Sequence, residues 1–223
     1  MAFEFSDKNL NRLERAISSE RLTPYRVRAR GDLWVALHLY SRNTELSEAL
    51  YGVVQGFEVF LRNATHARLT SAFGTEMWWE KASLRDRERD DVSDAIQNIE
   101  ERSSVLIPGK IVAELNLGFW TNLYSNYYER DLWVPFLRSS FPIHMQRKRL
   151  HDRLDRLKIL RNRIAHHESL VRRDVQQDYR ELLETVGWMS PTVRSWIEST
   201  NCFEERYVKR IPKRENIPEA NEL

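Results

Sequence analysis

The chain has 223 residues, a length that suits one large domain or two small ones, and its 41% content of hydrophobic residues is enough to build a core. Lysine and arginine total 35 against 33 aspartates and glutamates, which leaves a net charge of +2. This balance excludes the global basic field that many nucleic-acid-binding proteins carry, so any affinity for RNA must come from a local patch.

Cysteine content and the N-terminal segment indicate the compartment. Cys202 is the single cysteine, so no internal disulfide can form, and no Cys/His spacing resembles a zinc site. Residues 1–8 contain neither a basic stretch nor a long apolar run, so we expect no signal peptide and no membrane span. These features favour a cytoplasmic protein that needs no metal or cofactor.

Apolar residues recur at helical spacing along the sequence and period-two alternation is nearly absent, which predicts an all-α fold. Candidate caps mark helix starts at Ser6, at Thr23-Pro24 and at Asn43-Thr44, and the third helix should extend to about Phe73. A further helix should begin near Asp86, within a run of charged residues.

An aromatic segment follows a chain break at Pro108-Gly109. It contains Gly118-Phe119-Trp120 and continues to Tyr128. Exposed aromatic rings stack bases in single-strand binders, but aromatic side chains more often form cores and subunit interfaces. We therefore assign the segment to the core and to a dimer surface. The polar composition after residue 203 predicts one domain over residues 1–203 and a basic tail over residues 204–223.

The segment over residues 160–168 carries the most chemical information. It ends a predicted helix whose apolar residues recur at three- and four-residue steps and form one buried stripe: Leu150, Leu154, Leu157, Leu160 and Ile164. At about 100° per residue, Asn162 and His166 lie on nearly the opposite side of this helix. Arg161 lies at the edge of the stripe, and the small side chain of Ala165 keeps the polar arc open.

Arginine and histidine together can cleave RNA without a metal. A histidine such as His166 can take the proton of a ribose 2′-hydroxyl, because its ordinary pKa lies near neutrality. The guanidinium of Arg161 can hold the phosphate and stabilise the charge that develops on its oxygens. A structural interpretation is equally open: Arg161 binds a neighbouring helix, and His166 and His167 mark a helix end, where cations favour the dipole.

Three motifs resemble those of one family, and they occur along the chain in the same order as in that family. Arg161-x4-His166, with Asn162 after the arginine, resembles the R-x4-6-H signature of HEPN domains, and residues 160–168 resemble their abortive-infection (Abi-like) branch. Glu58-x3-Arg62 is similar to the Glu-x3-Arg/Lys motif on an earlier helix of that superfamily. The segment over residues 117–123 is similar to the aromatic stretch between the two helices.

The resemblance implies a helical bundle that dimerises through its R-x4-6-H helix and forms one composite ribonuclease site. It makes His166 the base, Arg161 the phosphate-binding residue and Asn162 their polar neighbour. Glu58 and Arg62 become a supporting pair from the earlier helix. It also implies a toxin-like antiviral role, with an antitoxin protein or small RNA as inhibitor. Glu168 departs from the pattern, because some HEPN toxins have there a tyrosine that an antitoxin modifies.

The composition of the same helix predicts a basic patch. Residues 147–163 contain eight positively charged residues and only two negatively charged ones, Asp152 and Asp155. Outside the catalytic set, the candidate RNA-binding residues are Arg147, Lys148, Arg149, Arg153, Arg156, Lys158, Arg163 and His167. Ion pairs on a solvated helix face are the alternative explanation, and they apply equally to Glu58 and Arg62, an i, i+4 pair of opposite sign.

Three functional hypotheses follow from these patterns. The first is a metal-independent endoribonuclease that cleaves RNA by 2′-hydroxyl attack. The second is a non-catalytic HEPN module that uses the same charges to bind RNA or a protein. The third is a structural dimerisation domain. Cleavage of RNA separates the first hypothesis from the others, and salt-dependent RNA binding separates the second from the third.

Overall fold

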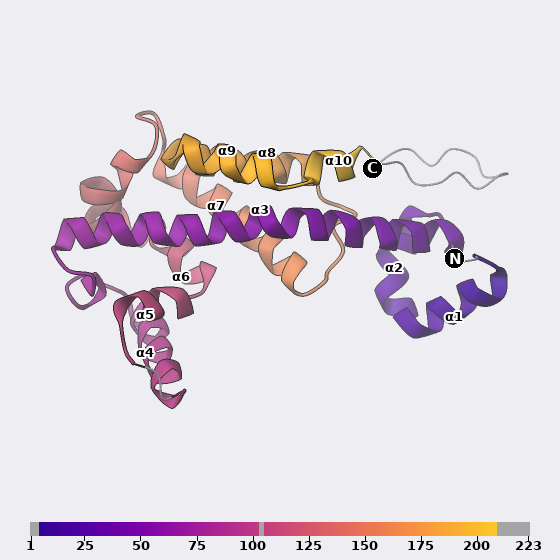
Figure 1. Ribbon diagram of the computed structural model, residues 1–223, viewed down its shortest axis with the longest axis horizontal. Coiled ribbons are helices and arrows are strands. Elements are labelled where there is room, and N and C mark those ends of the chain that lie inside the picture. The colour runs from indigo at the N-terminus through magenta and orange to yellow at the C-terminus, as the bar shows by residue number, and fades with distance from the viewer. Residues whose placement is uncertain (1–4, 103–104, 209–223) are drawn as a thin grey trace. The chain divides into compact units, whose positions relative to one another are not determined.

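The structure is a computed structural model that describes residues 5–102 and 105–208, and every regular element within these ranges is a helix (Figure 1). The all-α prediction is confirmed for these residues. The chain divides into two compact units, the first made of residues 1–52, 162–177 and 201–223 and the second of residues 53–161 and 178–200. The predicted boundary at residue 203 stays a prediction, and residues 209–223 of the predicted tail lie outside the described residues.

The α-helices are α1 (Asp7–Ile17), α2 (Ser19–Arg28), α3 (Leu33–Phe73), α4 (Asp86–Glu101), α5 (Pro108–Glu114), α6 (Leu117–Asn122), α7 (Arg147–Ala165), α8 (Val175–Met189), α9 (Pro191–Thr200) and α10 (Phe203–Tyr207). Shorter helical turns are η1 (Trp78–Glu80), η2 (Asn126–Tyr128), η3 (Glu129–Leu137) and η4 (Arg138–Ser140). Within the described ranges, none of these helices is long and apolar enough to cross a lipid bilayer.

The first two helices meet at Ser18, which has a φ of 81° and ends α1. Its hydroxyl oxygen accepts a hydrogen bond from the backbone N–H of Arg21 and so caps the start of α2. Pro24 lies inside α2. The prediction that Thr23-Pro24 opens a helix is therefore wrong, because Ser18 satisfies the free N–H groups of that helix several residues earlier.

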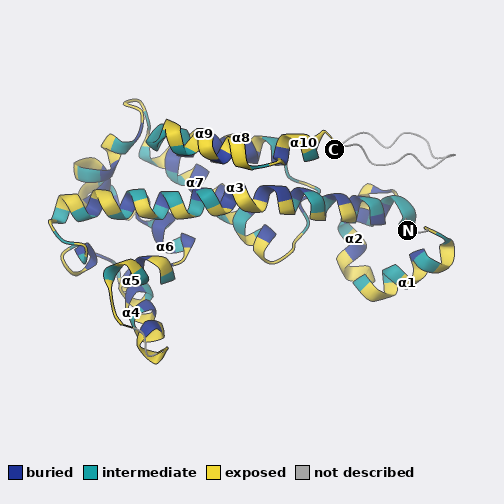
Figure 2. Ribbon diagram, in the orientation of Figure 1, coloured by how far each residue is buried: buried dark blue, intermediate teal, exposed yellow. Residues whose placement is uncertain are grey.

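Helix α3 is 41 residues long and begins before the predicted start at Asn43-Thr44. Buried and exposed residues alternate along it (Figure 2). Its first turn is capped by Asp32, whose carboxylate accepts from the N–H of Val35 at 2.8 Å. Asn43 instead accepts a hydrogen bond from the N–H of Leu170 at 2.7 Å. The predicted start at Asn43 is wrong, because its side chain is used in a contact with a distant part of the chain.

Each unit has its own core. In the first unit, α1, α2 and the start of α3 bury an apolar cluster: Leu10, Leu22, Tyr25, Ala29, Ala36, Leu37 and Leu39. In the second unit, the largest fully buried side chains are aromatic and include Trp78, Phe119, Trp120, Tyr124 and Tyr128. The prediction that the aromatic segment forms core is confirmed for Phe119, Trp120, Tyr124 and Tyr128. Its role as a dimer surface stays a prediction.

Helix α7 has the two faces that the leucine spacing predicts. All five residues of the apolar stripe are buried: Leu150, Leu154, Leu157, Leu160 and Ile164. Asn162, Ala165 and His166 are exposed. The stripe and the exposed polar arc are therefore confirmed, although α7 ends at Ala165 and His166 lies in the turn that follows.

Candidate active site

Arg161 near the end of α7 forms a salt bridge with Glu58 of α3, and both residues belong to the second unit. Its Nε donates to one carboxylate oxygen at 3.0 Å, and its Nη2 donates to the other at 3.4 Å. A two-point contact of this kind fixes the plane of the guanidinium. The third nitrogen, Nη1, makes no hydrogen bond with a described residue, and the side chain of Arg161 is 35% exposed.

Arg62 does not bind Glu58, although the two are four residues apart on α3. Its Nε contacts the side-chain oxygen of Asn63 and its Nη1 the carbonyl oxygen of Ala113, both at 3.4 Å. The interpretation of Glu58 and Arg62 as an ion pair within one helix is therefore wrong. No feature of the sequence indicates which basic residue Glu58 binds, because the partner comes from a helix that lies far along the chain.

The turn after α7 is closed by backbone hydrogen bonds. The N–H groups of His167 and Glu168 donate to the carbonyl oxygens of Ile164 and Arg163, at 3.1 and 2.7 Å. This pair of bonds is a Schellman motif, a common way to end a helix. His166 and His167 therefore mark a helix end, as the structural interpretation of the cluster predicts.

His167 has a φ of 56°, in the left-handed region that usually holds glycine at this position. Its carbonyl oxygen accepts a hydrogen bond from the guanidinium of Arg21 in α2, within the first unit. The backbone of His167 thus has a structural role, while its side chain is exposed.

His166 and Asn162 belong to the first unit, and both are exposed. The N–H of His166 donates to the carbonyl oxygen of Asn162 at 2.9 Å. Neither side chain has a hydrogen bond or ion pair with any residue that the structure describes. The imidazole of His166 is therefore accessible from solvent. Arg161 is the last residue of the segment 53–161 of the second unit. Arg161 and His166 therefore belong to different units, and each is described within its own unit.

Most of the predicted basic patch is paired with acidic side chains. The ion pairs join Arg147 to Glu129, Arg153 to Glu184, Arg156 to Glu181, Lys158 to Asp155, Arg161 to Glu58 and Arg163 to Glu168. Arg153 is also buried, with its guanidinium 4.4 Å from the ring centroid of Trp188. Lys148 and Arg149 are exposed and have no ion pair within the described residues, so the charges of these two residues of α7 are not offset. Binding of RNA by the patch stays a prediction.

His66, one turn beyond Arg62 on α3, has a structural role. Its Nδ1 accepts a hydrogen bond from the indole N–H of Trp78 at 3.1 Å, and its ring stacks on Trp79. Burial lowers the pKa of His66 below its ordinary value. A neutral ring that accepts a hydrogen bond suits core packing, so His66 is not part of the candidate site.

Within the described residues, no group of three or more His, Cys, Asp or Glu side chains is arranged to hold a metal ion. Comparisons with known proteins find no family model, no curated protein and no solved structure that matches this chain. The resemblance to HEPN domains therefore rests on the motif residues themselves. Their chemistry and their contacts are the basis for a functional assignment.

Proposed function

We propose that this chain is an endoribonuclease of the HEPN type, which cleaves RNA by attack of the ribose 2′-hydroxyl. The salt bridge between Arg161 and Glu58 carries the proposal, because it joins the two helices that bear the family-like motifs. A guanidinium held in one plane, with one nitrogen open, can bind a phosphate at a small cost in side-chain entropy. The exposed imidazole of His166 supplies the second group that the reaction requires.

In the proposed reaction, His166 takes the proton of the 2′-hydroxyl and the 2′-oxygen attacks the adjacent phosphorus. The bond from phosphorus to the 5′-oxygen breaks, and that oxygen receives a proton. Arg161 stabilises the negative charge on the phosphate oxygens, and Asn162 provides a polar neighbour. The products are a 2′,3′-cyclic phosphate and a 5′-hydroxyl end. The protein groups supply every proton transfer, so the scheme needs no metal.

One arginine and one histidine do not complete a base, an acid and a phosphate clamp. We therefore include a homodimer in the proposal, in which His166 or Arg161 of a second copy protonates or shields the leaving oxygen. The chemistry also fits a toxin-like role in abortive infection, with an antitoxin protein or small RNA as inhibitor. Glu168 replaces the tyrosine that some antitoxins modify, so inhibition by that modification is not part of the proposal.

The second candidate is a non-catalytic HEPN module that binds RNA or a protein. The hydrogen-bonded turn at His166 and His167 favours it, because histidines that end a helix need no catalytic role. This alternative predicts RNA binding that weakens with salt, without any cleavage.

The chemical ends that the protein leaves on RNA distinguish the nuclease from the non-catalytic module. The purified protein is incubated, with a metal chelator present, with a single-stranded RNA and with the same sequence carrying 2′-O-methyl groups. The proposal predicts that only the unmodified RNA is cut and that mass spectrometry finds 2′,3′-cyclic phosphate ends. Binding of both strands without a cut supports the non-catalytic module, and 3′-hydroxyl ends contradict the proposed chemistry.

A further inference from the structure

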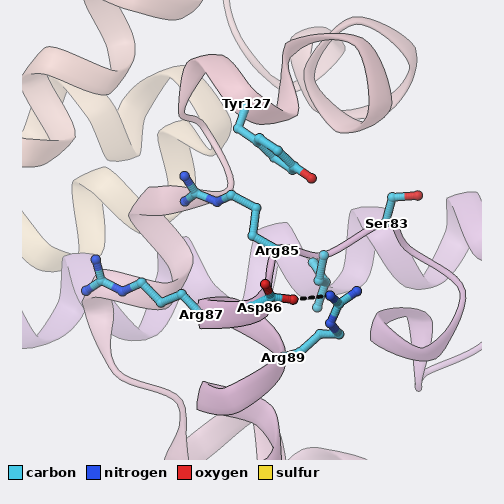
Figure 3. Close-up of a pocket in the computed structure, with 7 residues that line it drawn as sticks. Ser83, Arg85, Asp86, Arg87, Arg89 and Tyr127 are labelled. Atoms are coloured by element: carbon cyan, nitrogen blue, oxygen red, sulfur yellow. Dashed lines mark hydrogen bonds and ion pairs between the residues drawn. The ribbon is translucent and has the colours of Figure 1, made fainter.

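A second candidate site lies in the second unit and is formed by residues that the proposed cleavage does not use. A solvent-open hollow of about 470 Å³ is lined by the start of α7 and by the segment around η2, and its lining includes Arg85, Ser125, Tyr127, Lys148, His151 and Asp152. Arg85 and Tyr127 also line an adjoining hollow of about 660 Å³ at the start of α4 (Figure 3). These volumes lie within the range of small-ligand sites.

Two polar atoms of the lining residues lack partners. The Oγ of Ser125 and the Nε2 of His151 are shielded from solvent and have no hydrogen bond with any described residue. The other ring nitrogen of His151 lies 3.6 Å from a carboxylate oxygen of Asp155. Polar atoms in this condition are rare in folded proteins. Because both are shielded from solvent, they lie within the wall of the hollow and not on its open surface.

The aromatic wall of the hollow is fixed and yet accessible. Arg85 donates through Nε and Nη2 to the two carboxylate oxygens of buried Glu88, each at 2.9 Å. Its guanidinium packs on Tyr127, with its central carbon 5.0 Å from the ring centroid. Tyr127 nevertheless remains 52% exposed. An exposed ring on a rigid support is a platform on which a base can stack.

The charges of the hollow fit a ligand with both an anionic and a hydroxyl-bearing part. Arg85 is neutralised by Glu88, and Arg147 by Glu129, so Lys148 supplies the positive charge without an ion pair in the described residues. Asp152 is the negative side chain of the lining. A lysine can bind a phosphate, and an aspartate can accept hydrogen bonds from ribose hydroxyls.

From these features we infer that the hollow binds a ribonucleotide. The base stacks on Tyr127, the phosphate lies against Lys148, and Asp152 binds the ribose. The ligand is either a free nucleotide or one unit of an RNA strand, since both present the same three chemical parts. Binding here goes beyond the proposed cleavage and does not require it.

The test measures affinity by titration calorimetry for adenosine monophosphate and by fluorescence anisotropy for a labelled single-stranded RNA. The full-length protein carries His166→Ala in the RNA titration, so that the probe stays intact. We expect Tyr127→Ala to weaken the binding of adenosine monophosphate about tenfold and Lys148→Ala about fivefold, while Tyr127→Phe retains affinity. Arg138→Ala, which removes an exposed arginine outside both hollows, is the matched control.

The results show whether the ligand is a free nucleotide or an RNA strand, and one result contradicts the inference that the hollow binds a ribonucleotide. If the same variants also weaken RNA binding and the nucleotide competes with RNA, an RNA strand occupies the hollow. If only adenosine monophosphate binding responds, the ligand is a free nucleotide. Equal affinities of Tyr127→Ala, Lys148→Ala and Arg138→Ala for both probes overturn the inference. A wild-type protein that fails to cleave RNA refutes the proposed nuclease alone, because nucleotide binding is measured separately.

Discussion

Arg161 of α7 binds Glu58 of α3 through two guanidinium nitrogens and both carboxylate oxygens, at 3.0 and 3.4 Å. The side chains are 35% and 20% exposed, so solvent screens part of their attraction. A pair of this kind contributes about 1 kcal/mol to the free energy of unfolding. Its larger effect is on orientation, since it fixes the guanidinium that the proposed reaction uses.

We therefore expect Glu58→Gln to lower the rate of RNA cleavage about tenfold, because a loosely held arginine binds the transition state less well. The melting temperature should fall by only about 3 °C. Glu184→Gln is the control, since it breaks the ion pair with Arg153 elsewhere in the same unit. If both variants reduce cleavage equally, the pair between Glu58 and Arg161 has no special role in the reaction.

His167 should be a site where glycine stabilises the protein. A residue with a Cβ atom pays roughly 1 kcal/mol to adopt this left-handed backbone conformation, and glycine does not. Part of that gain is lost, because glycine also makes the unfolded chain more flexible. We expect His167→Gly to raise the melting temperature by about 2 °C and His167→Val to lower it. Scanning calorimetry of the three proteins tests this, and a glycine variant no more stable than the valine variant contradicts it.

Glu88 should be the acidic residue on which stability depends most. Its carboxylate is 0% exposed and accepts hydrogen bonds from Arg85, from the hydroxyl of Tyr128 at 2.6 Å and from Asn122 at 3.2 Å. Glu88→Gln leaves the guanidinium of Arg85 without its ionic partner. We expect a loss of about 3 kcal/mol in the free energy of unfolding, measured with denaturant.

The same carboxylate predicts a loss of stability in acid. Burial alone would raise the pKa of Glu88, but the bonds from Arg85, Tyr128 and Asn122 outweigh it, so the pKa is lowered. A lowered pKa stabilises the fold above the unfolded-state value of about 4.3, and the stabilisation is lost as the pH falls further. The melting temperature of the wild type should therefore fall more steeply below about pH 4.3 than that of Glu88→Gln. Parallel curves would contradict this.

His66 predicts a second pH dependence, in a milder range. Burial lowers the pKa of His66 in the folded protein. The unfolded chain therefore binds a proton at this histidine near pH 6.5, whereas the folded protein binds it only at a lower pH. Stability should therefore decrease as the pH falls from about 7.5 to about 5.5. His66→Gln can still accept the hydrogen bond from Trp78 and should flatten this slope. His144→Gln, at an exposed histidine, should leave the slope as it is in the wild type.

The face of a helix is predictable from spacing because burial repeats with the helix period. The leucines of α7 and the exposed position of His166 follow from that rule. The predicted helix starts at Ser6 and near Asp86 are also confirmed. Those at Thr23-Pro24 and Asn43-Thr44 are not, and at Asn43 the polar side chain binds a distant partner instead of the local backbone. Asn43 binds the N–H of Leu170, and Glu58 binds Arg161 in place of Arg62. Such choices are made by tertiary packing, which residue spacing does not encode.

The hollow around Tyr127 shows the same limit in an aromatic run. Tyr124 and Tyr128 are buried, whereas Tyr127 between them is 52% exposed. Their separation follows from the tight turn η2, whose position the composition of the segment does not reveal. The sequence predicts that the run is mainly core, and only the fold identifies the ring that remains accessible.

The most direct test of the proposed function is the rate of RNA cleavage by His166→Ala relative to the wild type, under single-turnover conditions. His144→Ala serves as the matched control, since it removes another exposed histidine. If His166 is the base that takes the 2′-hydroxyl proton, its removal should slow cleavage by about a hundredfold or more, while the control cleaves at the wild-type rate. Cleavage by His166→Ala at the wild-type rate would contradict the assignment.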